Sequence, residues 1–176
     1  MNRIGIAEFE KVSFNQWKKD VLSDDNYEMY SKFPESELKK IYDNIELPKR
    51  STSGSAGYDM HFPLPIMDIP VGFSIRIPTG IRCKMKNGWV GLIYPRSSLG
   101  IKNGLTILNT IPVIDEDYAY SDNEGHILLF VKNNGNKTLE MTQGLRIVQM
   151  VFAPYGTTTN DDATAKRNGG VGSTGK

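Results

Sequence analysis

A turn near the middle of the chain combines a fixed cation with two hydroxyl groups. Residues 94–100 read YPRSSLG, so that Arg96, Ser97 and Ser98 directly follow an apolar run of strand character. The planar guanidinium group of arginine suits phosphate oxygens, which it can bind through two parallel hydrogen bonds. The segment therefore predicts either a phosphate-binding turn or an ordinary surface turn with an exposed arginine.

An acidic run comes next, in residues 109–118 (NTIPVIDEDY). Three acids and Tyr118 lie just past an apolar, hairpin-like stretch. A carboxylate beside a dry wall can act as a general base on water, and Asp115 is the candidate. We expect Glu116 and Asp117 to be solvated, and an acidic turn that is solvated throughout is the alternative interpretation.

The C-terminal residues 167–176 (RNGGVGSTGK) hold four of the 17 glycines of the chain. A backbone without Cβ atoms can wrap an anion with its N–H groups, and Ser173 and Thr174 add hydroxyl donors. The glycine and lysine order of a P-loop is missing. The segment is therefore either a mobile tail or a lid that folds over phosphates.

Composition excludes several classes of function. The 176 residues carry 21 Lys and Arg against 20 Asp and Glu, so bulk charge gives no reason to expect nucleic-acid binding. No apolar stretch approaches the roughly 18 residues that span a bilayer, and the N-terminus lacks a signal-peptide core, so no membrane association is expected. A single cysteine, Cys83, fits a reducing compartment, and we expect a cytoplasmic protein. His61 and His126 have no partners at ligand spacing, which argues against a zinc site.

The residue pattern divides the chain into a helical N-terminal part and a longer part rich in strands. Residues 1–46 are expected to form a short helical arm, with helices over residues 14–22 and 35–45. The second of these has apolar side chains at i, i+3, i+4 and i+7, namely Leu38, Ile41, Tyr42 and Ile45. Such an arm would pack on the main domain or on a neighbouring subunit.

Residues 47–155 have the short β-branched and aromatic runs, separated by Gly, Pro and Asn, that are typical of a mainly β sandwich or barrel. Strands are predicted over residues 74–77, 80–85, 89–94, 105–108, 125–132, 138–141 and 146–152. Residues 156–176 are predicted to be a mobile C-terminal arm.

Five short motifs stand in a characteristic order: residues 56–59 (AGYD), 95–99 (PRSSL), 113–118 (VIDEDY), 144–149 (GLRIVQ) and 169–175 (GGVGSTG). With these motifs the chain resembles the trimeric dUTP pyrophosphatase (dUTPase) family over about 130 residues. The N-terminal arm and the loop of residues 119–125 resemble a subgroup found in bacteriophages and in Gram-positive or gut bacteria.

The resemblance implies a β-barrel or jelly-roll (β-clip) subunit, assembled as a homotrimer with three shared active sites. It implies hydrolysis of dUTP to dUMP and pyrophosphate by in-line attack of water on the α-phosphorus, with Mg²⁺ bound mainly through the triphosphate. Asp115 matches the carboxylate that deprotonates the water. Asp59 matches an acid that organises the water shell of the metal without ligating it.

The resemblance also assigns the remaining contacts. Phosphate-contacting positions are matched by Arg96, Ser97, Ser98, Gln149, Arg167, Ser173 and Thr174. Asn109 matches the asparagine that pairs with uracil, the main chain around Val113 and Ile114 helps to read the base, and Tyr118 matches the ring under the deoxyribose. In the last motif Val171, followed by Gly172, stands where the family usually has a stacking phenylalanine.

Pro112 replaces a common glycine, and the loop after Tyr118 is longer than usual. Two alternatives stay open at this point. One is a dCTP deaminase of the same fold, and the other is a nucleotide-sensing or regulatory protein that retains the pocket without turnover.

Overall fold

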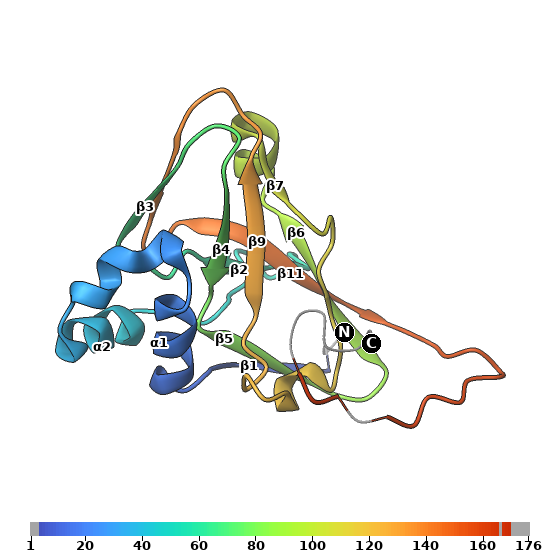
Figure 1. Ribbon diagram of the computed structural model, residues 1–176. Coiled ribbons are helices and arrows are strands. Elements are labelled where there is room, and N and C mark those ends of the chain that lie inside the picture. The colour runs from blue at the N-terminus through green and yellow to red at the C-terminus, as the bar shows by residue number, and fades with distance from the viewer. Residues whose placement is uncertain (1–3, 166, 170–176) are drawn as a thin grey trace.

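The computed structural model describes residues 4–165 and 167–169, and it is mainly β (Figure 1). The strands are β1 (Ala7–Lys11), β2 (Tyr58–His61), β3 (Ile66–Ile69), β4 (Ser74–Pro78), β5 (Ile81–Met85), β6 (Trp89–Pro95), β7 (Leu105–Ile107), β8 (Val113–Ile114), β9 (Leu128–Asn133), β10 (Leu139–Thr142) and β11 (Arg146–Pro154). The helices are α1 (Phe14–Leu22), α2 (Glu35–Asp43), the 3₁₀ segments η1 (Asp25–Lys32) and η3 (Tyr118–Tyr120), and the π-helical turn η2 (Ser98–Lys102).

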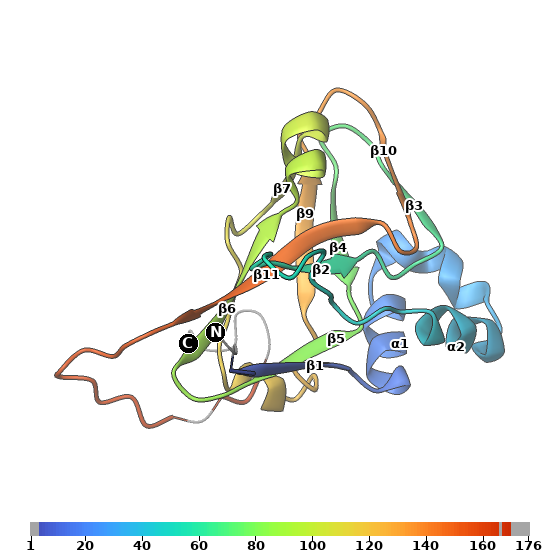
Figure 2. The same ribbon diagram turned by 180° about the vertical axis from the view of Figure 1, so that it is seen from behind.

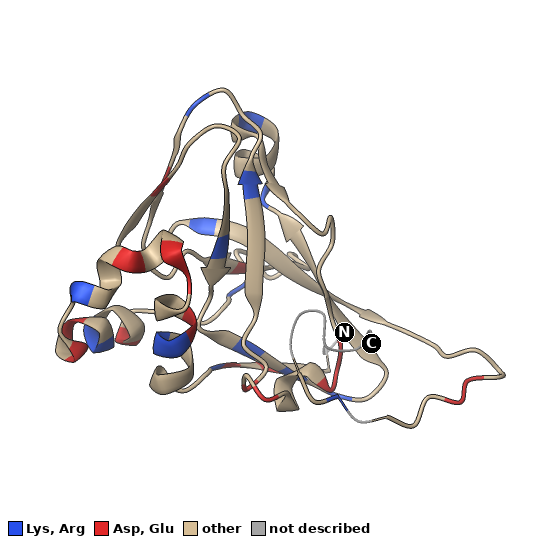
Figure 3. Cartoon of the chain, in the orientation of Figure 1, with Lys and Arg blue, Asp and Glu red and all other residues tan. Residues whose placement is uncertain are grey.

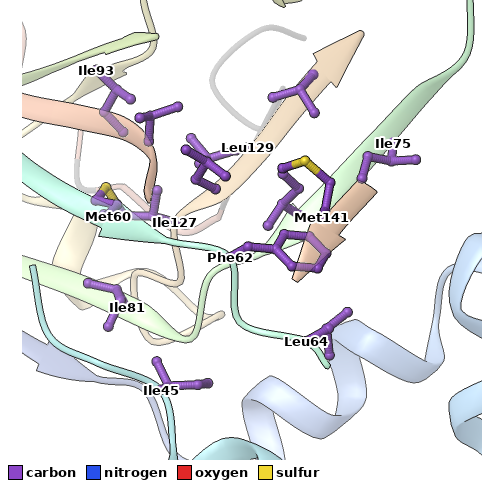
Figure 4. Close-up of a cluster of buried hydrophobic side chains, with 14 of the residues drawn as sticks. Ile45, Met60, Phe62, Leu64, Ile75, Ile81, Ile93, Ile127, Leu129 and Met141 are labelled. Carbon is purple, nitrogen blue, oxygen red and sulfur yellow. The ribbon is translucent and has the colours of Figure 1, made fainter. Parts of the chain in front are cut away.

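Four small antiparallel sheets wrap around one core. Their strand orders are β2-β11-β6-β8, β4-β9-β7, β1-β5 and β10-β3. Strand β9 shows how the sequence specifies this arrangement, because its burial alternates strictly and turns Leu129 and Val131 inward. Figure 4 shows Leu129 facing Met60, Ile127 and Met141 in the same buried cluster. The mainly β class expected from the sequence is confirmed.

The predicted strands are all present, with ends shifted by one to three residues. The strand expected from residue 125 begins only at Leu128, because residues 121–126 form turns. Strands β1, β2, β3 and β8 were not predicted, since each is short and its alternation is weak. The turn between β5 and β6 closes at Gly88, whose φ of 82° lies in the left-handed region that glycine adopts most readily.

The N-terminal segment is not the wholly helical arm that was expected. Residues 7–11 form β1, which pairs with β5, and its Glu10 forms ion pairs with Arg82 and Lys84. The helices that follow lie against one side of the barrel (Figures 1 and 2). Trp17, Tyr27 and Tyr30 are completely buried in the same core as the strands. The helical segment is therefore an integral part of the folded unit.

The C-terminal segment does not join the barrel. After β11, residues 155–165 contain no helix or strand, and they run outward before returning toward η3 (Figures 1 and 2). In the view of Figure 3, positively and negatively charged residues are interspersed along the helices and strands. Within the described residues, no helix is both long enough and apolar enough to cross a membrane.

Candidate nucleotide site

A pocket of about 370 Å³ opens between β8, η3 and the start of β9. Its lining is mostly apolar and consists of Leu108, Asn109, Pro112, Val113, Ile114, Tyr118, Ile127, Leu128 and Phe130. Leu108 and Val113 are more than half exposed, at 52% and 57%, so the pocket mouth is apolar as well. This site suits a flat, weakly polar group, with one amide side chain, Asn109, available to read its edge.

The hairpin that carries this pocket is held against β6. Ile114 pairs with Gly91, and the carbonyl of Pro112 accepts a hydrogen bond from the Ile93 N–H, so proline at this position costs the sheet no bond. At the hairpin tip Thr110 has a φ of 65°, which is unusual for a β-branched residue. This strained turn lies beside Asn109 and determines its position at the pocket mouth.

Asp115 follows β8 directly and stands beside Tyr118, whose N–H bonds to the Asp115 carbonyl. Its side chain is half-exposed and forms an ion pair with Arg167. Arg167 also contacts Asp117 at 3.0 Å, and its guanidinium carbon lies 5.5 Å from the centre of the Tyr118 ring. The C-terminal segment thus brings a cation to the pocket of its own chain.

Of the two acids expected to be solvated, Asp117 is exposed, at 53% for its side chain, whereas Glu116 is only partly exposed. Glu116 Oε2 accepts a hydrogen bond of 2.5 Å from the N–H of Gly88, which fixes the β5–β6 turn. Asp117 pairs with Arg167. Asp115 has no such role in a turn of the barrel, and it is the acid that borders Tyr118 and the end of β8.

A second polar cluster forms around Asp59, where β2, β6 and β11 meet. Asp59 Oδ2 accepts hydrogen bonds from Arg96 at 2.5 Å, Ser51 at 2.8 Å and Arg146 at 3.4 Å. Burial alone would raise the pKa of the Asp59 carboxyl, but the bonds from Ser51 and Arg96 outweigh it and hold the pKa below its ordinary value. The carboxylate is therefore ionised and holds Arg96 in place.

Strand β11 brings Gln149 into this cluster, because Gln149 stands opposite both Asp59 and Tyr94. Its side chain lies on Gly57, where a Cβ atom would come within 2.3 Å of Oε1. Ser97 and Ser98 follow Arg96 and are exposed at the start of η2. Together these groups form a cationic, donor-rich end of the sheet.

The two clusters do not meet within one chain. Ile114 pairs with Gly91, and Arg96 lies five residues farther along β6, a separation of roughly 16 Å at about 3.3 Å per residue. The structure thus brings together the residues predicted to contact the nucleoside. It also brings Asp59, Arg96 and Gln149 together, but within one chain these two groups lie apart. Val171, Gly172, Ser173 and Thr174 lie outside the described residues.

Sequence reasoning missed some of the groups at both places. Ser51 and Arg146 complete the surroundings of Asp59, and Leu128 and Phe130 form a wall of the pocket. The alternation of β9 is a signal that could have found the last two, since they stand on the face opposite the buried Leu129.

The apolar pocket suits the base of a nucleotide. The separate cationic end of the sheet suits its phosphates. These features define a nucleotide-binding β-barrel. The dUTPase family model matches residues 43–175. The chain belongs to the dUTPase family.

Individual relatives agree with this assignment. The deoxyuridine 5′-triphosphate nucleotidohydrolase of Lactococcus lactis is 40% identical over 134 residues, which cover 74% of this chain and 89% of the relative. The protein of the same description from Dictyoglomus turgidum is 33% identical, covering 78% of this chain and 96% of its own length.

Among solved structures, a dUTPase from Streptococcus mutans is 38% identical with a TM-score of 0.60, covering 67% of this chain and 91% of that one. A dUTPase from phage phi11 of S. aureus is 20% identical with a TM-score of 0.57, covering 70% and 92%, and its similarity concerns the fold alone. The family match begins at residue 43, after β1, α1 and η1.

Proposed function

We propose that this chain hydrolyses dUTP to dUMP and pyrophosphate. The observation that carries the proposal is the position of Asp115, at the end of β8 and beside an apolar pocket that has the size and lining for a nucleoside. A carboxylate placed there can take a proton from a water molecule that attacks the α-phosphorus. Membership in the dUTPase family supports the choice of substrate.

The residues around Asp115 would bind the nucleoside. Asn109 and the main chain at Val113 and Ile114 read the edge of uracil, and Tyr118 packs against the deoxyribose and leaves no room for a 2′-hydroxyl group. All four line the pocket. A reversed donor and acceptor pattern then disfavours cytosine, and the methyl group of thymine would clash.

The cationic cluster would bind the triphosphate, through Arg96, Ser97, Ser98 and Gln149, with Arg167, Gly172, Ser173 and Thr174 added by the C-terminal arm and Val171 covering the base. Arg96 is already oriented by its 2.5 Å contact with Asp59. Preorganised donors of this kind stabilise charge that develops in the transition state without reorganising.

The residues fit a Mg²⁺ ion that is held mainly by the substrate. The described residues contain no group of three or more acidic, histidine or cysteine side chains that could hold a metal by themselves. Among the described residues, the side-chain donors to Asp59 contact Oδ2, so Oδ1 could accept a bond from a metal-bound water, in keeping with the strong hydration of Mg²⁺. Neutralisation of the triphosphate charge is the chemistry that the bound ion supplies.

A single assay tests the activity. Purified protein is incubated with Mg²⁺ and dUTP, dCTP or dTTP, and release of pyrophosphate and ammonia is measured. Pyrophosphate is expected from dUTP alone, because only uracil matches the pocket edge and leaves it uncrowded. Ammonia from dCTP would identify a deaminase instead, and binding of dUTP without pyrophosphate release would identify a sensor.

We further propose that three copies assemble and share their sites. The separation of roughly 16 Å between the Asp115 and Arg96 clusters is too long for one substrate phosphate to bridge within a chain, so a neighbouring copy would supply the second cluster. Closed cyclic assemblies of this type build each interface from two different surfaces, which allows one site at every interface.

Mixing two inactive variants tests this arrangement. Asp115→Asn and Arg96→Gln chains are each expected to retain very little activity alone. After joint refolding in equal amounts, roughly a quarter of the sites should combine an intact Asp115 with an intact Arg96 from different copies. Recovered pyrophosphate release is the expected readout, and a mixture as inactive as its components would show that each site is built within one chain.

A further inference from the structure

A buried polar pair joins helix α1 to the loop that precedes β9. Asp20 of α1 is 9% exposed, and its Oδ2 lies 2.5 Å from Nδ1 of His126, which is completely buried. Gln16 donates a second hydrogen bond of 2.8 Å to the same oxygen. Burial alone would raise the pKa of Asp20, but the bonds from His126 and Gln16 outweigh it and hold the pKa below its ordinary value.

The partners of the His126 ring fix its tautomer. Nε2 accepts a hydrogen bond of 2.8 Å from the backbone N–H of Gly80, so this nitrogen carries no proton. Nδ1 therefore carries the proton and donates it to Asp20. The ring is clamped between α1 and the turn that joins β4 to β5, and its orientation is determined from both sides.

The main chain of His126 in turn holds Tyr118. The Tyr118 hydroxyl donates a hydrogen bond of 2.8 Å to the His126 carbonyl, and Asn123 donates to both oxygens, at 3.1 and 3.2 Å. The next two residues, Ile127 and Leu128, form part of the pocket wall. His126 thus connects α1 to Tyr118 and to a wall of the pocket.

A second contact ties the same loop to the other end of α1. Glu124 accepts hydrogen bonds of 2.6 Å from both the N–H and the hydroxyl of Ser13, which is the N-cap residue of α1. Glu124 has a φ of 58°, an unfavourable conformation for a residue with a Cβ atom that the paired bonds compensate. The loop after Tyr118 is therefore fastened to both ends of the helix.

We propose that Asp20 and His126 are positioning residues that hold the Tyr118 ring at the sugar end of the pocket, so that the N-terminal helical segment enforces selection of deoxyribose over ribose. The inference rests on the proposed function, because it assigns a cause to the selectivity of that same site. It gives a role to a segment that lies largely outside the family match.

The variant Asp20→Ala tests the proposal. Without the carboxylate the His126 ring loses its restraint on the α1 side, and the Tyr118 ring gains room to move. The ratio of kcat/KM for dUTP to kcat/KM for UTP is expected to fall about tenfold, mostly through better use of UTP. Asp20→Asn should keep the wild-type ratio, because the amide oxygen can still accept the bond from Nδ1.

Two further variants separate positioning from general stability. Tyr30→Phe removes a hydrogen bond from the same helical segment to the Ile66 carbonyl, with no link to Tyr118, and should lower the Tm without changing the ratio. Glu124→Ala, which loosens the second anchor at the surface, should lower the ratio less than Asp20→Ala. An unchanged ratio in Asp20→Ala, or an equal fall in Tyr30→Phe, would overturn the proposal.

The relative affinities for dUMP and UMP give the same information without turnover. Binding measured by calorimetry should show the dUMP preference of the wild type shrinking in Asp20→Ala. Should the wild type release no pyrophosphate from dUTP, the proposed function fails, while the affinity ratio still decides whether Asp20 positions Tyr118.

Discussion

Replacing Asp115 with asparagine is expected to reduce kcat for dUTP by about 10³-fold while leaving the affinity for a non-hydrolysable dUTP analogue nearly unchanged. The amide keeps the size of the side chain but cannot take a proton from water. Asp115 contacts Arg167 and borders Tyr118, so the change removes the base without altering the pocket lining. Single-turnover pyrophosphate release and analogue titration measure the two quantities separately.

Asp117→Asn is the matched control. Asp117 carries the same charge, lies two residues away and shares the partner Arg167. Asp117 is not assigned the role of general base, so this variant should retain most of the wild-type kcat. Turnover near the native level in Asp115→Asn would refute the assignment, and an equal loss in both variants would show that the ion pair with Arg167 matters rather than the base.

Replacing Arg96 with glutamine is expected to lower kcat/KM for dUTP by about 10²-fold or more and to lower the Tm. The first effect follows from the loss of a charged, bidentate donor to the triphosphate. The second follows because Asp59 loses the partner at 2.5 Å. Leaving a buried carboxylate with fewer hydrogen bonds lowers the free energy of unfolding by about 1 kcal/mol or more. Steady-state kinetics and thermal unfolding at fixed protein concentration measure the two effects.

The double variant Arg96→Gln with Asp59→Asn distinguishes these effects, since it should regain part of the Tm but none of the activity. Arg146→Gln is the milder control, because Arg146 contacts the same oxygen at 3.4 Å and is half-exposed. The pKa of Asp59 lies below its ordinary value of 3.8, so the pairing stabilises the fold above that pH and is lost as the pH falls further. The Tm difference between wild type and Arg96→Gln should therefore shrink in strong acid.

The barrel was predictable from the sequence to the extent that each strand alternates by itself. Strands such as β9, with its alternating Leu129 and Val131, were therefore found, whereas β8, with only two residues, exists because Gly91 and Ile93 of β6 offer it bonds. Strand β1 likewise depends on β5. Pairing partners that are distant in sequence leave no local pattern to detect.

The candidate site was predictable residue by residue but not in its geometry. Asp115, Tyr118 and Asn109 lie within ten residues, and their grouping follows from one hairpin. The separation of Arg96 from Asp115 is a property of the sheet register, and no spacing along the chain reports it. The contact between Asp20 and His126 joins residues 106 positions apart, and it gives a specific partner to a histidine whose spacing in the sequence only argued against a zinc site.

The ion pair between Arg167 and Asp115 has a consequence for the timing of catalysis. Arg167 donates to Asp115 through Nη2 and to Asp117 through Nε, so a phosphate that takes these same donors would displace the two carboxylates. If Arg167 binds the triphosphate as proposed, the Asp115 carboxylate would lose this counter-ion and be free to accept a proton. Under the proposed function, substrate binding and release of the general base would then take place in one exchange of the partners of Arg167.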